Sequence, residues 1–199
     1  LLLALLCGCT AAPAEPTGGL KRYQATFLTL FDTVTTIVGY AESEEAFTAT
    51  AQAIHDQLLE YHQLYDIYNE YEELSNIKTI NDHAWEQPVE VDQRIIDLLQ
   101  FSKELYTQTG GRVNIAMGSV LRLWHDAREA GIQDPGAAAL PDGEALELAA
   151  AHTDIDSIQI DPEQGTVFLS DPEVRLDVGA IAKGYAVELA AQAAEERGL

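Results

Sequence analysis

The sequence is short of basic residues. It contains 11 Lys and Arg residues against 33 Asp and Glu residues, which gives a formal net charge of -22 at pH 7. A surface field of that sign repels polyanions at long range. We therefore expect no nucleic acid among the partners, and we interpret the acidic surface as one that keeps the protein soluble.

Cysteine is also scarce. The only cysteines, Cys7 and Cys9, both lie close to the start of the chain. The sequence from residue 10 onward therefore cannot contain a disulfide, and redox cross-linking is excluded as a source of its stability.

The first residues lack a hydrophobic run long enough to span a bilayer. Residues 1–6 are too few for a membrane helix, and they end at small residues, as the hydrophobic core of a secretory signal does. Leu6-Cys7-Gly8-Cys9 resembles a lipobox, in which the thiol of Cys9 would carry a diacylglycerol anchor. We expect residues 1–9 to be a signal-peptide remnant, residues 10–20 to be a flexible tether, and the protein to be lipid-anchored outside the bacterial cell membrane. An ordinary cleaved leader and a buried N-terminus are the alternatives.

The remaining sequence predicts strands at several places. Residues 23–40 alternate apolar and β-branched side chains and predict two strands around a turn near Phe31-Asp32-Thr33. Residues 157–160 and 166–169 predict a hairpin, and residues 174–178 predict one further strand.

Helices are expected between these strands. Asp92 is expected to cap a helix that Thr109-Gly110-Gly111 ends, because paired glycines supply the positive φ found after helix C-termini. Apolar residues at helical spacing predict further helices over residues 44–65, 118–128, within 137–151, and 181–197. The interspersed pattern predicts an α+β fold, with mixed or antiparallel sheets packed against helices in one domain from residue 21 to 199.

Residues 175–186, Arg-Leu-Asp-Val-Gly-Ala-Ile-Ala-Lys-Gly-Tyr-Ala, are the most informative for chemistry. The expected strand ends near Asp177, the chain turns at Gly179, and a helix begins with amide groups available to an anion. Lys183 could reach a diphosphate, and Asp177 could accept hydrogen bonds from a ribose or a heterocycle. From spacing alone, a phosphate site and a tight turn with an exposed lysine both stay open.

This segment resembles the D-x-G-x-I-A-K-G-Y-A signature of the ApbE family, the FAD:protein FMN transferases. Residues 68–75 with Asn81, and residues 109–118 with Leu123-Trp124, are similar to two further blocks of that family in the same order. Phe31-Asp32-Thr33 stands where the family has Met-Gly-Thr. The similarity covers nearly all of the chain after residue 20.

The resemblance implies a set of residues that bind FAD and Mg²⁺. The backbone carbonyl of Ala180 would be a ligand of Mg²⁺, which takes oxygen ligands together with substrate phosphates. Aromatic side chains are suited to stack on the flavin ring. The implied FAD contacts are Phe31 and Tyr68 at the flavin, Arg112, Val113 and Asn114 along the adenosine, and Asp177 and Lys183.

The implied reaction is a Mg²⁺-dependent transfer of FMN from FAD to a Thr or Ser hydroxyl of an acceptor protein with an FMN-binding domain, with release of AMP. Family members continue further, so the domain is expected to be incomplete at its C-terminus and the catalytic residues are expected beyond residue 199. A Mg²⁺-dependent FAD pyrophosphatase and a non-catalytic flavin-binding lipoprotein are the alternatives. The histidines show no metal-binding spacing and are interpreted as packing.

Overall fold

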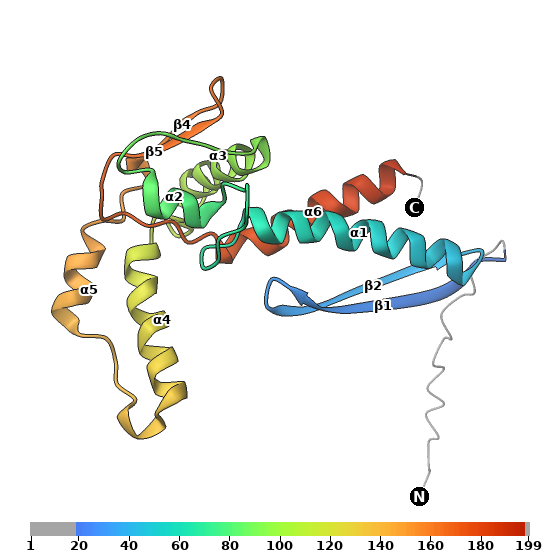
Figure 1. Cartoon of the computed structure of the whole chain (residues 1–199), viewed down its shortest axis with the longest axis horizontal. Helices are drawn as coiled ribbons and strands as arrows, with labels where there is room; N and C mark the ends of the chain where they lie inside the picture. Colours follow the sequence, from blue (N-terminus) through green and yellow to red (C-terminus); the bar gives the residue numbers. More distant parts are fainter. Residues whose placement is uncertain (1–18, 198–199) are drawn as a thin grey trace, which may run out of the picture. The chain divides into compact units, whose positions relative to one another are not determined.

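The computed structural model describes residues 19–197, which form two compact units that divide between His55 and Asp56 (Figure 1). The predicted lipidation site Cys9 and residues 10–18 of the predicted tether lie outside the described residues. One domain from residue 21 to 199 stays a prediction. Over residues 19–197, no helix combines the length and the apolar character that crossing a membrane requires.

The first unit is a β-hairpin followed by the start of a helix. β1 (Lys21–Leu30) and β2 (Thr33–Ala41) pair antiparallel, and α1 (Glu44–Leu64) begins in this unit. The ring of Tyr23 stacks on that of Phe47 with 5.5 Å between centroids. The predicted pair of strands is therefore confirmed.

The turn of this hairpin has an unusual backbone. Phe31 and Asp32 connect the strands with φ values of 53° and 51°. Paired left-handed residues match the twist of a two-residue hairpin turn, although each non-glycine residue costs roughly 1–2 kcal/mol in that conformation. The predicted turn is confirmed at this position, where glycine would relieve the strain.

The second unit packs helices against a small sheet. β3 (Val89–Glu90), β4 (Ile158–Asp161) and β5 (Thr166–Leu169) lie in the order β3-β5-β4, and both pairs are antiparallel. The remaining elements are α2 (Ile77–His83), α3 (Gln93–Gln108), α4 (Gly118–Gln133), η1 (Pro135–Ala137), α5 (Gly143–Ala150), η2 (Ile155–Ser157) and α6 (Gly179–Glu196).

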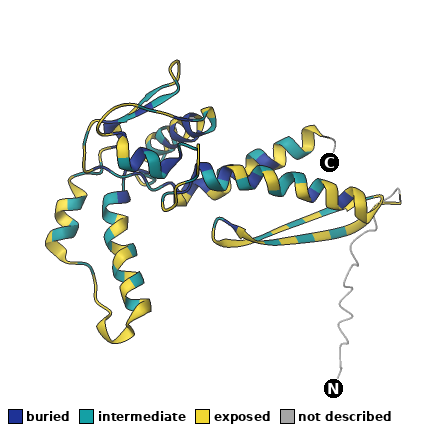
Figure 2. Ribbon diagram, viewed as in Figure 1, coloured by how far each residue is buried: buried dark blue, intermediate teal, exposed yellow. Residues whose placement is uncertain are grey.

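The core of the second unit lies around α2, α3 and the sheet. Ile80, Leu98 and Val167, from these three elements, are 0% exposed. Figure 2 shows buried residues on α2, α3 and the β4–β5 pair, whereas α4 and α5 are mostly exposed or intermediate. Helices and antiparallel strands together confirm the α+β fold class.

Local polar chemistry sets the helix ends, largely as predicted. The side chain of Asp92 accepts a hydrogen bond from the amide of Arg94 at 2.9 Å and starts α3, and Gly110 and Gly111 follow its end with φ values of 61° and 81°. α4 continues beyond the predicted residue 128 to Gln133.

Residues 174–178 do not form the predicted strand. Over the described part of the chain, the segment has one isolated parallel bridge, between Met117 and Arg175. A strand needs a partner strand for its backbone groups. Here these groups bond instead to the Asn81 side chain and to the backbone of Ile115 and Gly118.

Candidate functional site

The loop that carries Tyr68 is built around one carboxylate, that of Asp66, which is only 8% exposed. Its Oδ1 accepts hydrogen bonds from the amides of Tyr68 at 2.7 Å and Asn69 at 3.1 Å. Its Oδ2 accepts from Asn69 Nδ2 at 2.9 Å and from the Tyr71 hydroxyl at 2.8 Å. Burial raises the pKa of Asp66, but these hydrogen bonds outweigh burial and hold the pKa below its usual value. An ionised aspartate therefore fixes this loop, which we call the Asp66 loop (residues 66–71).

α2 begins with a reciprocal cap that joins it to the same loop. Asn76 accepts a hydrogen bond from the Thr79 amide at 3.0 Å and donates its own amide to Thr79 Oγ1 at 3.2 Å. The Asn76 side chain also donates to the carbonyl of Asn69 at 2.9 Å. This capping box satisfies amides that a helix start leaves open. α2 is therefore anchored to the loop that carries Tyr68.

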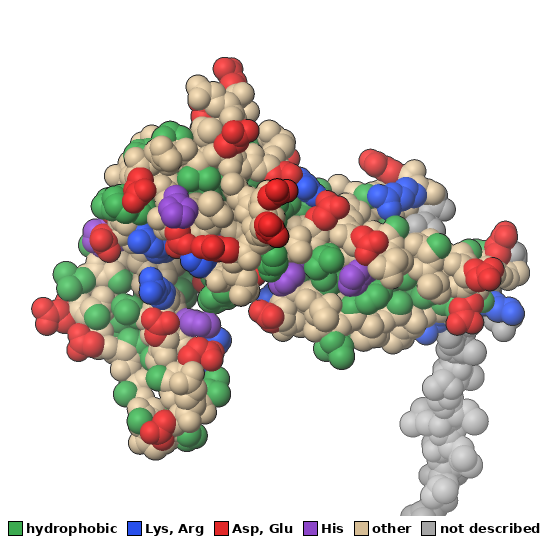
Figure 3. Space-filling model, viewed as in Figure 1, with side chains coloured by type: hydrophobic (Ala, Val, Ile, Leu, Met, Phe, Trp, Pro, Cys, Tyr) green, Lys and Arg blue, Asp and Glu red, His purple; other side chains and the backbone are tan. Residues whose placement is uncertain are grey.

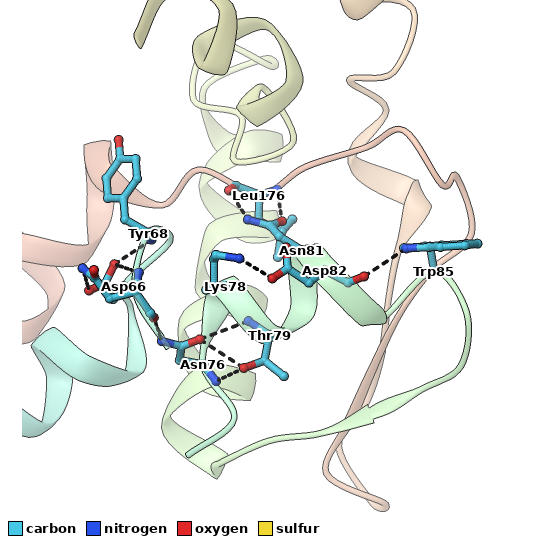
Figure 4. Close-up of polar contacts among 10 residues, drawn as sticks. Asp66, Tyr68, Asn76, Lys78, Thr79, Asn81, Asp82, Trp85 and Leu176 are labelled. Carbon is cyan, nitrogen blue, oxygen red and sulfur yellow. Dashed lines mark hydrogen bonds and ion pairs between the residues drawn. The ribbon is translucent and has the colours of Figure 1, made fainter. Parts of the chain in front are cut away.

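Residues 174–178 are anchored to α2 and to the start of α4. Asn81 Nδ2 donates to the carbonyl of Leu176 at 3.0 Å, and the Leu176 amide donates back to Asn81 Oδ1 at 2.7 Å (Figure 4). The Gly118 amide donates to the carbonyl of Arg175 at 3.0 Å. A Cβ atom on Gly118 would lie 2.5 Å from that carbonyl oxygen, so the close approach requires glycine.

These elements enclose a cavity of about 340 Å³ within the second unit. Small-molecule sites commonly measure roughly 300–1,000 Å³, so this cavity is at the small end of that range. We call it the α2–α4 cavity. Its lining residues are Ile67, Tyr68, Lys78, Asn81, Asp82, Gly118, Leu121, Arg122, His125, Asp126, Arg175, Leu176 and Asp177.

The cavity has balanced charge in a strongly acidic protein. Its lining contains three of the 11 Lys and Arg residues of the chain, and three carboxylates. Figure 3 shows Lys and Arg side chains close together on this unit. An anionic ligand therefore meets less repulsion here than a net charge of -22 would otherwise cause.

Tyr68 and His125 form an aromatic wall of the cavity. Their ring centroids are 5.0 Å apart with an interplanar angle of 29°. The Tyr68 hydroxyl lies 3.4 Å from His125 Nδ1, and Arg128 Nη2 lies 3.0 Å from the same nitrogen. Both neighbours carry hydrogen-bond donors, so the Tyr68 hydroxyl and the Arg128 guanidinium hold the His125 ring from two sides. Tyr68 is 53% exposed, so its ring has surface available for a planar ligand.

The corner before α6 offers fewer amide donors than its sequence suggested. The Gly179 amide donates to Asp177 Oδ1 at 2.9 Å, so a carboxylate of this chain takes the first amide of the helix. The amides of Ile181 and Ala182 both donate to the carbonyl of Val178, at 2.9 and 2.8 Å. Asp177 nevertheless lines the α2–α4 cavity.

The loop after α3 uses its polar groups within the fold. The Val113 amide donates to Thr109 Oγ1 at 3.1 Å, and Asn114 Nδ2 donates to the carbonyl of Thr153 at 2.8 Å. Arg112 is exposed. The Asn114 side chain therefore joins two loops of the second unit.

The structure brings two of the predicted FAD contacts together, Tyr68 and Asp177, as lining of one cavity. The others lie outside this lining, and Lys183 is exposed on α6. Phe31 belongs to the first unit, in the turn between β1 and β2. The binding roles of all these residues stay predictions.

The expected Mg²⁺ ligand, the carbonyl of Ala180, belongs to an exposed residue in the first turn of α6. Within residues 19–197, no group of three or more His, Cys, Asp or Glu side chains is arranged to hold a metal ion. The described residues therefore do not by themselves form a metal site built from such side chains.

Among the residues of the cavity lining, sequence reasoning gave no ligand-binding role to Lys78, Arg122 or His125. The signal for the two cations is present, because each stands four residues before an aspartate on the same helix. His125 was interpreted as packing, and nothing in its spacing separates it from the other histidines.

Comparison with known proteins identifies relatives across almost the whole chain. The model of the ApbE family matches residues 31–199. An FAD:protein FMN transferase of Klebsiella pneumoniae (strain 342) is 26% identical over 203 residues, which cover 98% of this chain and 54% of that protein. One of Treponema pallidum (strain Nichols) is 30% identical over 116 residues, covering 56% of this chain and 30% of that protein. The chain thus spans about half the length, or less, of the curated relatives it matches.

Solved structures show the same fold. The ApbE protein of Thermotoga maritima matches with a TM-score of 0.71 and 27% identity, over 87% of this chain and 52% of that one. The apo form of the Pseudomonas stutzeri flavinyl transferase ApbE matches with a TM-score of 0.73 and 18% identity, over 92% of this chain and 56% of that one. At 18% identity, the similarity to the Pseudomonas stutzeri structure shows the fold alone.

Proposed function

Because this chain belongs to the ApbE family, we propose that it acts as an FAD:protein FMN transferase, which moves FMN from FAD to a Thr or Ser hydroxyl of an acceptor protein and releases AMP. One observation carries the proposal: the family match over residues 31–199 coincides with a cavity that Tyr68 and Asp177, from two separate family motifs, line together.

The residues of the α2–α4 cavity fit part of a flavin nucleotide. Stacking a planar ring on Tyr68 removes apolar surface from water, and the His125 ring behind it limits the orientations that Tyr68 can take. Asp177 Oδ1 is held by the Gly179 amide, so the carboxylate has a fixed position from which to accept hydrogen bonds from the ligand. In this proposal the protein positions the substrate, and FAD supplies the group that is transferred.

Mg²⁺ is part of the proposal because of the family resemblance. The carbonyl of Ala180 would be one ligand, because Mg²⁺ is a hard cation that prefers oxygen ligands from the protein and from phosphates. When bound, the ion would neutralise charge that develops on the diphosphate. The described residues supply no set of three His, Cys, Asp or Glu side chains that could hold the ion.

A transfer assay tests the proposal. The protein extended to its natural C-terminus is incubated with FAD, Mg²⁺ and a threonine-containing acceptor domain, and the mass of the acceptor is measured by mass spectrometry. A mass gain equal to FMN, with release of AMP, is the expected result. AMP without the mass gain would instead identify a hydrolase, and FAD that is retained without turnover would identify a carrier.

The predicted contact from Lys183 is tested separately. Replacing Lys183 with Ala should weaken FAD binding by about 1.5–3 kcal/mol, the range for a hydrogen bond to a charged group. Lys21→Ala in β1 is the matched control and should leave the affinity unchanged. An equal affinity of the Lys183 variant and the unaltered chain, in a flavin fluorescence titration, would contradict this contact.

We also propose that Cys9 carries a lipid that holds the protein at the outer side of the cell membrane. The support is the lipobox-like sequence Leu6-Cys7-Gly8-Cys9. In bacterial cells, Cys9→Ser should move the protein from the detergent-rich to the aqueous phase of a detergent partition. Cys7→Ser is the control and should stay with the detergent; a Cys9 variant that also stays there would rule out this anchor.

A further inference from the structure

We propose that Lys78 and Arg122 bind a phosphate group of the flavin nucleotide in the α2–α4 cavity and so select phosphorylated flavins over riboflavin. This inference rests on the proposed function. It assigns the phosphate to cations on α2 and α4, which the sequence motifs did not indicate.

The two cations reach the cavity from different helices, and each has a carboxylate partner one turn further on. Lys78 Nζ pairs with Asp82 Oδ2 on α2. Arg122 Nε lies 3.8 Å from Asp126 Oδ2 on α4. All of these side chains line the cavity. The pairs hold both cations at the cavity before any ligand binds.

Neither pair should prevent a phosphate from binding. The Arg122–Asp126 pair is long, and its side chains are 72% and 62% exposed, so solvent screens most of its attraction. The Lys78–Asp82 pair is closer, and its side chains are 27% and 35% exposed, so it is the stronger competitor but is also reached by solvent. A phosphate offers several acceptor oxygens and, with Arg, can form two parallel hydrogen bonds. The carboxylates therefore act as competitors that a phosphate displaces.

Arg175, the third cation of the lining, is engaged differently. Its Nη1 donates to the backbone carbonyls of Pro172 and Val174, both at 2.7 Å. These contacts hold the guanidinium against its own loop. Lys78 and Arg122 are therefore the two cations of the lining whose partners are carboxylates that an anion can replace.

The aromatic wall and the two cations share one small cavity. Tyr68 provides a ring surface, and Lys78 and Arg122 provide positive charge within the same lining. A ligand that uses both must combine a planar ring with a phosphate, as the FMN half of FAD does. The volume of about 340 Å³ suits one half of the dinucleotide better than all of it.

The test uses the opposite charges of one ion pair. Affinities for FAD and for riboflavin are measured with the full chain by flavin fluorescence titration. Lys78→Met should weaken FAD binding about 10- to 100-fold, the size of a charge-assisted contact. Asp82→Asn should tighten FAD binding because the competitor is neutral. Both variants should bind riboflavin as the unaltered chain does.

A purely structural role of the pair predicts a different pattern. Both substitutions break the same ion pair, so a structural effect would change the affinities for FAD and riboflavin in the same direction in both variants, which would overturn the inference. Arg122→Gln and Asp126→Asn repeat the test on α4, and Lys21→Met is a control for total charge. Melting temperatures of all variants confirm that each is folded.

Inorganic pyrophosphate separates this inference from the proposed function. If Lys78→Met and Asp82→Asn bind FAD with unchanged affinity, the inference is overturned and the transferase proposal still holds. Pyrophosphate binding that depends on Lys78, without any FAD binding, supports the phosphate site and overturns the flavin function. If neither probe binds, both proposals fall.

Discussion

The Asp66 loop and residues 174–178 line the same cavity but are held in place in different ways. The carboxylate of Asp66 accepts its hydrogen bonds from residues at most five positions away in the sequence. The partner that holds Leu176, Asn81, is 95 positions away. The loop can therefore form its contacts locally, whereas residues 174–178 take their path only once α2 and α4 are in place.

This difference predicts where the site is sensitive to substitution. Contacts at long sequence separation join elements that each depend on the rest of the unit, so their loss should affect the whole second unit. Loss of a local contact should mainly loosen one loop. Four substitutions separate these cases.

Replacing Asn81 with Leu should have the largest effect. It leaves the amide and carbonyl of Leu176 without partners, and a buried group that loses its partner costs about 1–3 kcal/mol, so we expect a loss of about 4 kcal/mol in the free energy of unfolding. Urea denaturation measures it. Gln100→Leu, on the exposed side of α3, is the control and should change stability by less than about 0.5 kcal/mol. A similar loss in both variants would contradict the special role of Asn81.

Gly118→Ala should come next, with a loss of about 2 kcal/mol, because the added methyl group overlaps the carbonyl of Arg175 and must push residues 174–178 away. Gly184→Ala in α6 is the matched control. A Cβ at Gly184 meets nothing within 4 Å, so alanine should stabilise the helix by about 0.5–1 kcal/mol. Thermal melts should show shifts of opposite sign, and shifts of the same sign would refute the steric argument.

Asp66→Asn tests the local loop, with an expected loss of about 1–2 kcal/mol at neutral pH. The pKa of Asp66 is lower in the folded than in the unfolded state, so its ionised form stabilises the fold. That contribution is complete above the unfolded pKa of about 3.9 and disappears as the pH falls through the folded value. Denaturation at several pH values should therefore show that the free energies of unfolding of the unaltered chain and of Asp66→Asn become equal in acid. A stability difference that persists in acid, where the carboxylate is protonated in the folded and the unfolded state, would count against its role.

The smallest effect is expected at Asp177. Asp177→Ala removes the acceptor for the Gly179 amide at the start of α6 and should cost about 1 kcal/mol. Asp177→Asn keeps an acceptor oxygen and should lose less than half of that. If both variants are equally destabilised, then the Asp177 side chain contributes through something other than this hydrogen bond.

Much of the fold could be predicted because its signals are local. The β1–β2 pair shows in an alternating pattern, and Asp92 and Gly110-Gly111 mark the two ends of α3 by the hydrogen bonds and backbone angles they supply. The strand predicted over residues 174–178 was wrong for the opposite reason. Its apolar residues fit a strand, but no local pattern reveals that a side chain and loop backbone, and not a strand, are the hydrogen-bond partners of its backbone groups.

The candidate site was predictable only in part. Tyr68 and Asp177 were found through family motifs, and the structure places both in the lining of one cavity. Lys78, Arg122 and His125 lie in positions where charge pairs and histidines are common on any helix surface. Only their convergence distinguishes them, and convergence requires that α2, α4 and residues 174–178 be packed together.

The sequence by itself determined the family, the fold class and most helix and strand positions, because periodicity, caps and turns act between residues that are near in the chain. The tertiary structure alone decided which charges share a cavity, which acceptors bind the amides at the corner before α6, and the course of residues 174–178. These depend on contacts between residues as far as 95 positions apart. Such contacts form only when packing brings the elements together.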